Sequence, residues 1–298
     1  MFRGGLPPAI QLTIRISGGQ PTSKRLRSVF EVMLEARNIS IKYNARIAVN
    51  DVSLRVDPGR VISIIGPNGA GKSTLLRALN GSVTPSAGDV MLDDRPLHDY
   101  ARRVIARRIA VVAQEADVRF PVTVFEFVLG GRYAWANATA WGWESERDIQ
   151  LAQNAIRETE LVDFESRLMN ELSGGERQRA VLARALATEA KIFLLDEPTA
   201  NLDLAHQATM LRLIRSRCDT NNSAAIVVTH DVNLAAEFSD DVMLLKNGRT
   251  VAFGAPAEVF TEEQIKRVFD LQVLVDAHPV SGAPRVTPIH EMRSVPPA

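Results

Sequence analysis

A glycine-rich loop at residues 66–74 limits the folds open to this chain more than any other feature. A continuous apolar run at 61–65 precedes the loop, and a stretch with helical character at 75–79 follows it. This strand–loop–helix order matches the phosphate-binding pattern G-x-x-x-x-G-K-[ST] in full. The loop consists of Gly66, Pro67, Asn68, Gly69, Ala70, Gly71, Lys72, Ser73 and Thr74.

The residue types in this loop suit a bound phosphate. Glycines let backbone N–H groups approach phosphate oxygens, and the N-terminus of the following helix adds a partial positive charge. The ammonium group of Lys72 can reach β- and γ-phosphates, and the hydroxyl of Ser73 can ligate Mg²⁺. A chance glycine-rich turn is the alternative, but the strand and the helix on either side argue against it.

A second candidate site follows the apolar run 192–195, which predicts a buried parallel strand. Asp196 and Glu197 come directly after this run, at the strand end where ligands of open α/β sheets bind. Asp196 can hold Mg²⁺ through water, and Glu197 can orient and polarise an attacking water. Two acids after a strand can also cap a helix, but the phosphate-binding loop upstream favours a catalytic site.

The segment Leu172-Ser173-Gly174-Gly175-Glu176 predicts another helix start that can bind an anion. Ser173 can cap the helix, and the two glycines free backbone N–H groups for the anion. A nucleotide on the phosphate-binding loop has no evident need of this segment within the same chain. We therefore expect a two-fold dimer, in which each chain offers its loop to one ATP and its residues 173–175 to the other.

Composition places the chain among soluble globular proteins. It has 298 residues, 46% of them hydrophobic, and a formal net charge of zero, which gives no sign of a strongly basic nucleic-acid surface. The single cysteine, Cys218, excludes an intramolecular disulfide and is expected to be structural. We expect neither a transmembrane helix nor a signal peptide, because the apolar runs are short or interrupted.

Three segments are expected along the chain. Residues 1–32, rich in Gly, Pro, Ser and Arg, predict a poorly ordered extension, and Met33 is a candidate for the true start. Mass spectrometry of the native protein tests that start, and an intact Met1 terminus contradicts it. The main domain is expected at 33–270 with a helical insertion at about 116–170, and a C-terminal strand and tail at 271–298.

Periodicity predicts an α/β fold. Val52, Leu54 and Val56 alternate with polar residues, which indicates strands in the region 34–56, with Tyr43 in the loop between the first two. Four-to-six-residue apolar runs predict further buried strands at 109–112, 224–229 and 242–245. Helices are expected between them, at 102–108, 175–187, 205–217, 232–238 and 258–269. The turn Asn247-Gly248 predicts a hairpin after the last of these strands.

Together these motifs resemble the nucleotide-binding subunit of ATP-binding cassette (ABC) transporters, over about 33–269. Six elements occur in the family's order, and together they make a chance match implausible. They are the phosphate-binding loop, Gln114 after a strand, the LSGGE segment at 172–176, Asp196-Glu197, Asn201-Leu202-Asp203, and His230. The resemblance implies a P-loop NTPase (RecA-like) core with an N-terminal antiparallel β subdomain and a helical insertion.

The resemblance also implies roles for single residues. Tyr43 would stack on the adenine of ATP, Gln114 would sense Mg²⁺ and the γ-phosphate, and His230 would contact the γ-phosphate. Asp203 would work across the dimer interface. By themselves, Tyr43 would more often be a surface or packing aromatic, and Asp203 a helix cap. The resemblance implies four catalytic residues, which are Glu197, His230, Gln114 and Lys72. It implies that Mg²⁺ is held by Ser73, Gln114 and Asp196. The residues expected to contact the ATP of the opposing subunit are Ser173, Gly174, Gly175 and Glu176.

Within the family, the segments 120–133, 195–207 and 279–284 resemble importers of iron–siderophore complexes, haem and cobalamin. Such a subunit forms a homodimer on the cytoplasmic face of the inner membrane, binds separate permease chains, acts indirectly with a substrate-binding protein and needs no nucleic acid. The chain departs from the family pattern after Tyr133, where Trp135, Trp141 and Trp143 occur. These tryptophans form either a local cluster or a patch for a partner.

Three alternatives stay open at this stage. An importer of zinc or manganese would share the same motifs. A soluble ABC ATPase of DNA repair or translation would typically carry two cassettes or a long coiled-coil insertion, and neither is seen. A nucleotide kinase would share only the phosphate-binding loop, and the LSGGE segment argues against it.

Overall fold

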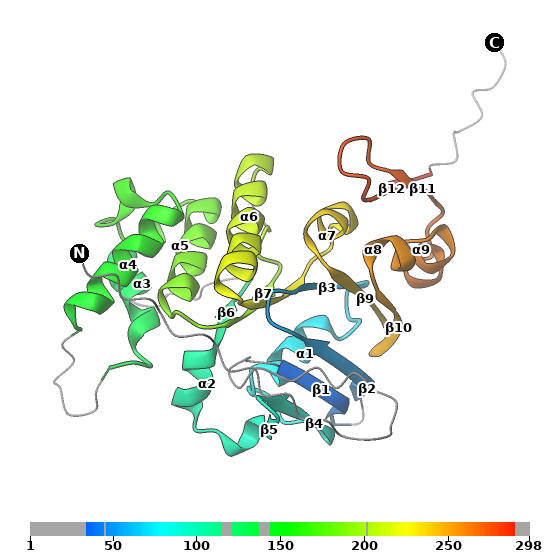
Figure 1. The fold of residues 1–298 in the computed structure, drawn as a ribbon, viewed down its shortest axis with the longest axis horizontal. Coiled ribbons are helices and arrows are strands. Elements are labelled where there is room, and N and C mark those ends of the chain that lie inside the picture. The colour runs from blue at the N-terminus through cyan, green and yellow to red at the C-terminus, as the bar shows by residue number, and fades with distance from the viewer. Residues whose placement is uncertain (1–33, 45, 115–120, 137–143, 201, 290–298) are drawn as a thin grey trace, which may run out of the picture. The chain divides into compact units, whose positions relative to one another are not determined.

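The computed structural model describes residues 34–44, 46–114, 121–136, 144–200 and 202–289 (Figure 1). All of them belong to one compact unit, Glu31–Ala298. The predicted extension 1–32, Asn201, Trp141 and Trp143 lie outside the described residues.

The first sheet is antiparallel and has the strand order β2-β1-β4-β5. Its strands are β1 (Leu34–Tyr43), β2 (Arg46–Val56), β4 (Ala87–Leu92) and β5 (Arg95–Pro96). The predicted alternation is present, because Val52, Leu54 and Val56 are buried while the residues between them are exposed. The prediction for Tyr43 was wrong in one respect: pairing with Arg46 makes it the last residue of β1 rather than a loop residue.

The second sheet has six strands in the order β10-β9-β3-β8-β7-β6. All neighbouring strands are parallel except β10 (Arg249–Gly254), which forms the predicted hairpin with β9 (Asp241–Lys246). The other strands are β3 (Val61–Ile65), β6 (Ile109–Val112), β7 (Ile192–Asp196) and β8 (Ala224–Val228). Because β6 is the edge strand, Val111 is exposed, although its whole run was predicted to be buried. The carboxyl ends of the parallel strands therefore meet at one edge of this sheet.

Helices connect the strands, as the crossovers of a parallel sheet require. They include α1 (Lys72–Leu79), α2 (Arg102–Arg108), α5 (Gly174–Ala187), α6 (Leu204–Asn221) and α7 (Val232–Phe238). The helix predicted at 258–269 is in fact two, α8 (Pro256–Val259) and α9 (Glu262–Phe269). A new helix begins here because the Thr261 side chain accepts a hydrogen bond from the Gln264 N–H and caps α9. No helix in the described ranges is long and apolar enough to cross a membrane.

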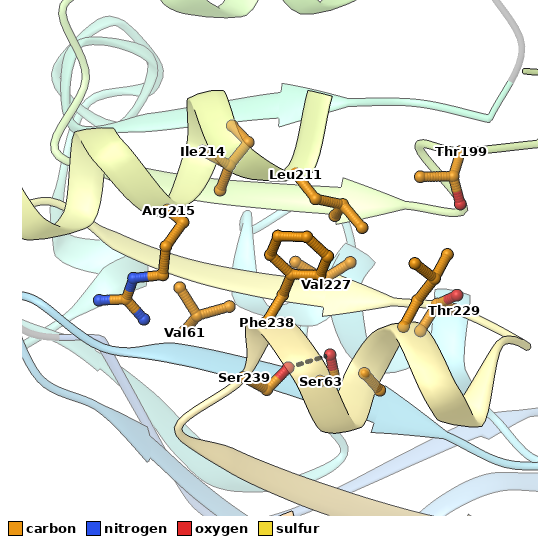
Figure 2. A pocket seen from close by; sticks show the side chains of 12 residues that line it. Val61, Ser63, Thr199, Leu211, Ile214, Arg215, Val227, Thr229, Phe238 and Ser239 are labelled. Carbon is orange, nitrogen blue, oxygen red and sulfur yellow. Dashed lines mark hydrogen bonds between the residues drawn. The ribbon is translucent and has the colours of Figure 1, made fainter. Parts of the chain in front are cut away.

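A cavity of about 20 Å³ lies between α6, α7 and the six-stranded sheet (Figure 2). Leu211 of α6, Val227 of β8 and Phe238 of α7 are among the side chains that line it. Next to it, the hydroxyls of Ser63 and Ser239 are 2.6 Å apart and tie the end of α7 to β3. A space of this size holds no more than about one water, so it is a packing gap rather than a ligand site.

The predicted helical insertion contains α3 (Val124–Leu129), α4 (Glu146–Glu158) and the short 3₁₀ turns η2 (Gly130–Arg132), η3 (Val162–Phe164) and η4 (Met169–Glu171). Thr123 starts α3 and Ser145 starts α4, each through a reciprocal capping box. The helices α3 and α4 pack against α5 through one apolar cluster. These elements confirm the predicted fold class: an α/β core, an antiparallel β subdomain and a helical insertion.

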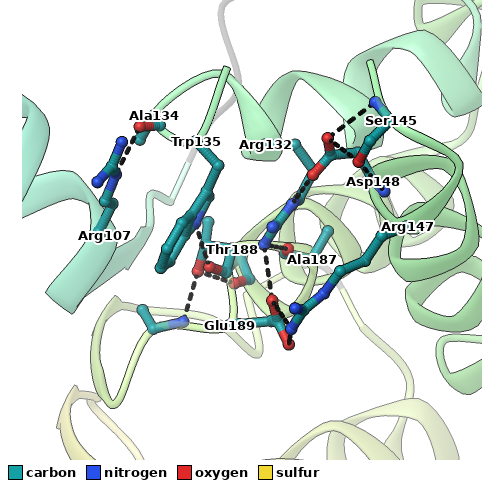
Figure 3. A network of polar contacts seen from close by, with 12 residues as sticks. Arg107, Arg132, Ala134, Trp135, Ser145, Arg147, Asp148, Ala187, Thr188 and Glu189 are labelled. Carbon is teal, nitrogen blue, oxygen red and sulfur yellow. Dashed lines mark hydrogen bonds and ion pairs between the residues drawn. The ribbon is translucent and has the colours of Figure 1, made fainter. Parts of the chain in front are cut away.

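Arg132 joins the parts of this insertion (Figure 3). Its guanidinium donates to Asp148 of α4 (2.7 Å), to the Ala187 carbonyl at the end of α5 (3.0 Å) and to Glu189 (3.2 Å). Trp135 donates its indole N–H to the Thr188 carbonyl at 2.9 Å, and the Arg132 guanidinium lies 5.1 Å from the centre of its ring. Trp135 thus packs locally, which was one of the two alternatives for the tryptophan-rich stretch.

Replacing Arg132 with leucine is expected to lower the free energy of unfolding by about 3 kcal/mol, because it removes a buried cation from the partly buried carboxylate of Asp148. Arg147→Leu is the matched control, since Arg147 pairs with Glu189 but its side chain is 73% exposed. Arg147→Leu should lower the free energy of unfolding by less than about 1 kcal/mol. Urea denaturation measures both values, and equal losses would contradict the assignment.

The cost of Arg132→Leu should also depend on pH. Burial raises the pKa of Asp148, but hydrogen bonds from Ser145 and Arg132 outweigh it, so the folded-state pKa is lowered. A lowered pKa adds stability above the unfolded-state value of about 3.9, and this contribution disappears as the pH falls through the folded-state value. The difference between wild type and variant should therefore shrink below about pH 4.

Cys218 should be unreactive in the folded protein. It lies in α6 with 1% of its surface exposed, and burial raises the pKa of its thiol to about 12. Because the thiolate is the nucleophile, a thiol reagent at pH 8 should label the native protein at least about a hundredfold more slowly than the protein in denaturant. Equal labelling rates would show that the thiol is accessible, and the predicted structural role would then be wrong.

Candidate active site

The phosphate-binding loop lies between β3 and α1, and the backbones at Leu245 and Ala48 pack closely against it. A Cβ atom added to Gly66 would lie 2.0 Å from the Leu245 carbonyl oxygen, and one added to Gly71 would lie 2.3 Å from the Ala48 carbonyl oxygen. Gly71 also has a φ of 104°, in the region that favours glycine, and it caps α1. The loop therefore presents bare backbone, and the first amides of α1 have no carbonyl partner within the helix.

The β9–β10 hairpin holds this loop from the side. Gly248 in its turn donates its N–H to the Ala70 carbonyl at 2.9 Å and accepts a hydrogen bond from the Asn50 N–H at 2.8 Å. The turn thus joins the phosphate-binding loop to β2. Sequence reasoning had placed this hairpin but not its contact with the loop, because no local pattern signals a contact over such a distance along the chain.

Lys72 supplies the cation of the site. Its ammonium donates to the carbonyls of Gly66 (2.8 Å) and Pro67 (3.1 Å), and the residue is only 6% exposed. Burial lowers the pKa of Lys72, while the nearby carboxylates of Glu197 and Asp196 act in the opposite direction. These two acceptors are uncharged carbonyls, so the hydrogen bonds do not neutralise the ammonium. Lys72 is therefore suited to bind an anion on the loop.

The other predicted residues come from the neighbouring strand ends. Glu197 directly follows β7, His230 follows β8, and Gln114 follows β6, so adjacent strands of the sheet supply them. The amide of Gln114 donates to Glu197 Oε2 at 3.0 Å, and Nε2 of His230 lies 2.5 Å from Glu197 Oε1. The structure therefore brings these three residues together at the edge that carries the phosphate-binding loop.

The backbone at Glu197 is unusual. Its φ is 49°, a left-handed conformation that few residues other than glycine adopt, and its N–H donates to the Val228 carbonyl at 2.9 Å. Such strain often occurs at functional sites, where the surrounding structure holds it. Here it turns the chain sharply at the end of β7 and directs the carboxylate between Gln114 and His230. Nothing in the sequence signals this conformation.

The donor set near the loop suits a hard cation such as Mg²⁺. The Ser73 hydroxyl donates to Asp196 Oδ1 at 3.2 Å, so two oxygen ligands lie side by side. Within the described residues no three His, Cys, Asp or Glu side chains form a metal-binding group, so phosphate oxygens and waters would complete the coordination. Gln114, the third predicted ligand, contacts Glu197 through its amide nitrogen.

The LSGGE segment forms a separate feature at the start of α5. The Ser173 hydroxyl accepts from the Glu176 N–H at 3.3 Å, and the Glu176 carboxylate accepts from the Ser173 N–H at 2.7 Å. The second of these bonds lowers the pKa of Glu176. In the part of the chain that the structure describes, no hydrogen bond or ion pair links residues 173–176 with the phosphate-binding loop. The two predicted phosphate-binding elements are thus not joined within one chain.

Two further predicted residues lie on the surface. Asp203 caps α6 by accepting from the His206 N–H at 2.9 Å, and this bond lowers the pKa of Asp203. The helix cap, which was the alternative for this residue, is therefore present. Its carboxylate also lies 2.8 Å from His206 Nδ1, a partner that the sequence analysis missed. Tyr43 is 44% exposed at the end of β1.

Comparison with protein families and known proteins gives consistent matches. The profile of the ABC transporter family matches residues 49–200. The hemin import ATP-binding protein HmuV of Thermobifida fusca is 42% identical over 258 residues, which cover 87% of this chain and 89% of that protein. The cobalamin import ATP-binding protein BtuD of Halobacterium salinarum is 39% identical over 261 residues, which cover 88% of this chain and 65% of that protein.

Solved structures share the fold. A metal-chelate type ABC transporter in an inward-facing conformation superposes with a TM-score of 0.75 at 28% identity, over 87% of this chain and 98% of that one. The bacterial ABC transporter cassette MJ0796, in a dimeric structure, gives a TM-score of 0.68 at 28% identity, over 74% of this chain and 98% of that one.

Proposed function

Because this chain belongs to the ABC transporter family as an ATP-binding, ATP-hydrolysing subunit, we propose that it powers an importer of haem, cobalamin or an iron–siderophore chelate. The observation that carries this proposal is the identity of 42% and 39% with relatives named hemin and cobalamin import ATP-binding proteins. An ATP-binding subunit does not touch the transported compound, so the class of substrate is the finest assignment that we make.

In this proposal, hydrolysis depends on Glu197, which orients and polarises the attacking water. Gln114 and His230 hold its carboxylate, at 3.0 Å and 2.5 Å, and His230 also contacts the γ-phosphate. Lys72 binds the β- and γ-phosphates, and Tyr43 stacks on the adenine. Phosphoryl transfer needs little covalent help, so positioning and charge account for the rate.

We also assign Mg²⁺ to this site, with Ser73, Asp196 and Gln114 as the residues that would hold it. The oxygen pair of Ser73 and Asp196 supports the assignment. When bound, the ion neutralises charge on the phosphate oxygens.

The working unit is a homodimer with two composite sites. Residues 173–176 of one chain complete the ATP site at the phosphate-binding loop of the other, and Asp203 acts across the interface. Leu204, next to Asp203, supports this assignment because its apolar side chain is 84% exposed. ATP would have to favour the closed dimer by several kcal/mol, about 5.5 kcal/mol for a complete switch.

We place the ATPase domain at 33–270, with the helical subdomain at about 116–170 and a C-terminal segment at 271–298. Its partners are integral-membrane permease chains, so the subunit lies peripherally on the cytoplasmic face of the membrane. A substrate-binding protein acts with the complex indirectly, and no nucleic acid takes part.

Reconstitution tests the proposal. The chain should co-purify with a permease encoded beside it, and the complex in liposomes should hydrolyse ATP faster when its binding protein delivers haem, cobalamin or a ferric siderophore. Zinc and manganese salts serve as the negative control, and they should not stimulate ATP hydrolysis by the complex. Stimulation by zinc or manganese alone would assign the other importer class, and failure to bind any permease would favour a soluble ABC ATPase.

A further inference from the structure

A small hairpin near the C-terminus forms a sheet of its own. Strand β11 (Val273–Ala277) pairs antiparallel with β12 (Pro284–Pro288), and within the described residues this sheet has no other strand. An isolated two-stranded hairpin is marginally stable in water, so this one depends on its attachment. Val273 and Val286 supply an apolar part of it, since they are 3% and 8% exposed and pack in the cluster that contains Ala235 and Ala236 of α7.

Polar contacts fix the hairpin to α7. The side-chain amide of Asn233 accepts from the Val286 N–H at 2.8 Å and donates to the Val286 carbonyl at 3.2 Å. It thereby binds the edge of β12 as a neighbouring strand would. One turn later on the same helix face, Glu237 accepts a hydrogen bond from the Ser281 hydroxyl at 2.6 Å. The face of α7 that carries Asn233 and Glu237 is therefore held by the hairpin.

The opposite side of α7 is packed less completely. Leu234, Ala235 and Phe238 line the cavity of about 20 Å³ between this helix, α6 and the sheet (Figure 2). Side chains next to such a gap lose part of their van der Waals contacts. A helix of seven residues also has little stability of its own. The hairpin therefore helps to fix the position of α7, together with the contact between Ser63 and Ser239.

The start of α7 is coupled to the candidate active site. Asp231 caps this helix by accepting from the Leu234 N–H at 2.9 Å, and His230 is the residue directly before the cap. The His230 side chain is 45% exposed, and among the described residues its ion-pair partner is Glu197. His230 lies between the end of β8 and the first turn of α7, so both elements set its position.

We propose that Asn233 is a positioning residue for ATP hydrolysis: by binding the β11–β12 hairpin to α7, it holds His230 against Glu197. This inference rests on the proposed hydrolytic roles of His230 and Glu197. It assigns the C-terminal hairpin a part in setting the turnover rate.

The full-length protein with Asn233→Ala should hydrolyse ATP with a kcat lowered about tenfold, because a misplacement of about 1 Å at a catalytic group can cost up to about a hundredfold. The KM for ATP should not change, since the phosphate-binding loop and Lys72 belong to other elements. Asn154→Ala is the matched control, because Asn154 is an exposed amide on α4, and its kcat should equal that of wild type.

A double-mutant cycle separates positioning from general damage. In a His230→Ala background, Asn233→Ala should lower kcat no further, because Asn233 acts through His230. Equal losses in both backgrounds, or an unchanged kcat in Asn233→Ala alone, would overturn the inference. If His230→Ala and Glu197→Gln both retained full activity, the proposed hydrolytic site would fail instead, so the two failures are distinguishable.

Discussion

Glu197→Gln should bind ATP, form a stable ATP-bound dimer and lose at least about a hundredfold in hydrolysis rate, the lower end of the effect of a general base. Glutamine keeps the size of the side chain, and its carbonyl oxygen can still accept the hydrogen bond from Gln114, so the site should keep its shape. What it cannot do is take a proton from the attacking water. Nucleotide affinity should therefore persist while turnover stops.

Two measurements check this result. Size-exclusion chromatography with ATP should move the variant to the dimer position, and phosphate release should fall to background. Glu263→Gln is the matched control, because Glu263 is exposed in the first turn of α9, and its turnover should match wild type. Full ATPase activity in Glu197→Gln would refute the role of this carboxylate.

Lys72→Met should lose ATP binding itself. Methionine keeps most of the apolar stem but removes the charge, and hydrogen bonds from a charged donor contribute about 1.5–3 kcal/mol each. Loss of the contacts to two phosphates should therefore weaken ATP affinity at least about a hundredfold. Titration with a fluorescent ATP analogue measures this, and turnover should fall with it.

The thermal stability of the nucleotide-free protein separates this effect from misfolding. Lys72→Met loses the hydrogen bonds to the Gly66 and Pro67 carbonyls but also removes a charge whose burial is unfavourable, so its melting temperature should stay near that of wild type. Lys266→Met, at an exposed site on α9, is the control for both measurements. Wild-type affinity in Lys72→Met would exclude the proposed phosphate contacts.

The site was largely predictable because its parts lie at the ends of apolar strands. Runs such as 192–195 locate a parallel strand, and the carboxyl ends of such strands must meet at one edge. The contact between Gln114 and Glu197, over 83 positions of the chain, follows from that rule and the two motifs. The capping of α5 by Ser173 was predictable for a simpler reason, since the serine and Glu176 are three residues apart.

The rest depends on tertiary contacts that leave no local pattern. The left-handed turn at Glu197 accompanies a hydrogen bond from its N–H to the Val228 carbonyl of the neighbouring strand β8. The break of the helix predicted at 258–269 depends on Thr261 capping α9, and periodicity alone does not distinguish one helix from two. Likewise, the apolar pattern near the C-terminus predicted a strand or two, but not that Asn233 would bind one of them.

The close packing behind the phosphate-binding loop restricts how this gene can vary. Every single-base missense change of a glycine codon introduces a residue with a Cβ atom. At Gly66 and Gly71 that atom would lie 2.0 Å and 2.3 Å from a backbone carbonyl oxygen, distances that no side-chain rotation relieves. Neither position therefore has a neutral one-step mutation at the protein level, whereas Gly282, with no atom within 4 Å of such a Cβ, is restricted only by its φ of 75°. In natural variants of this chain we therefore expect only synonymous changes in the codons of Gly66 and Gly71, whereas the codon of Gly282 can also change to one for another residue.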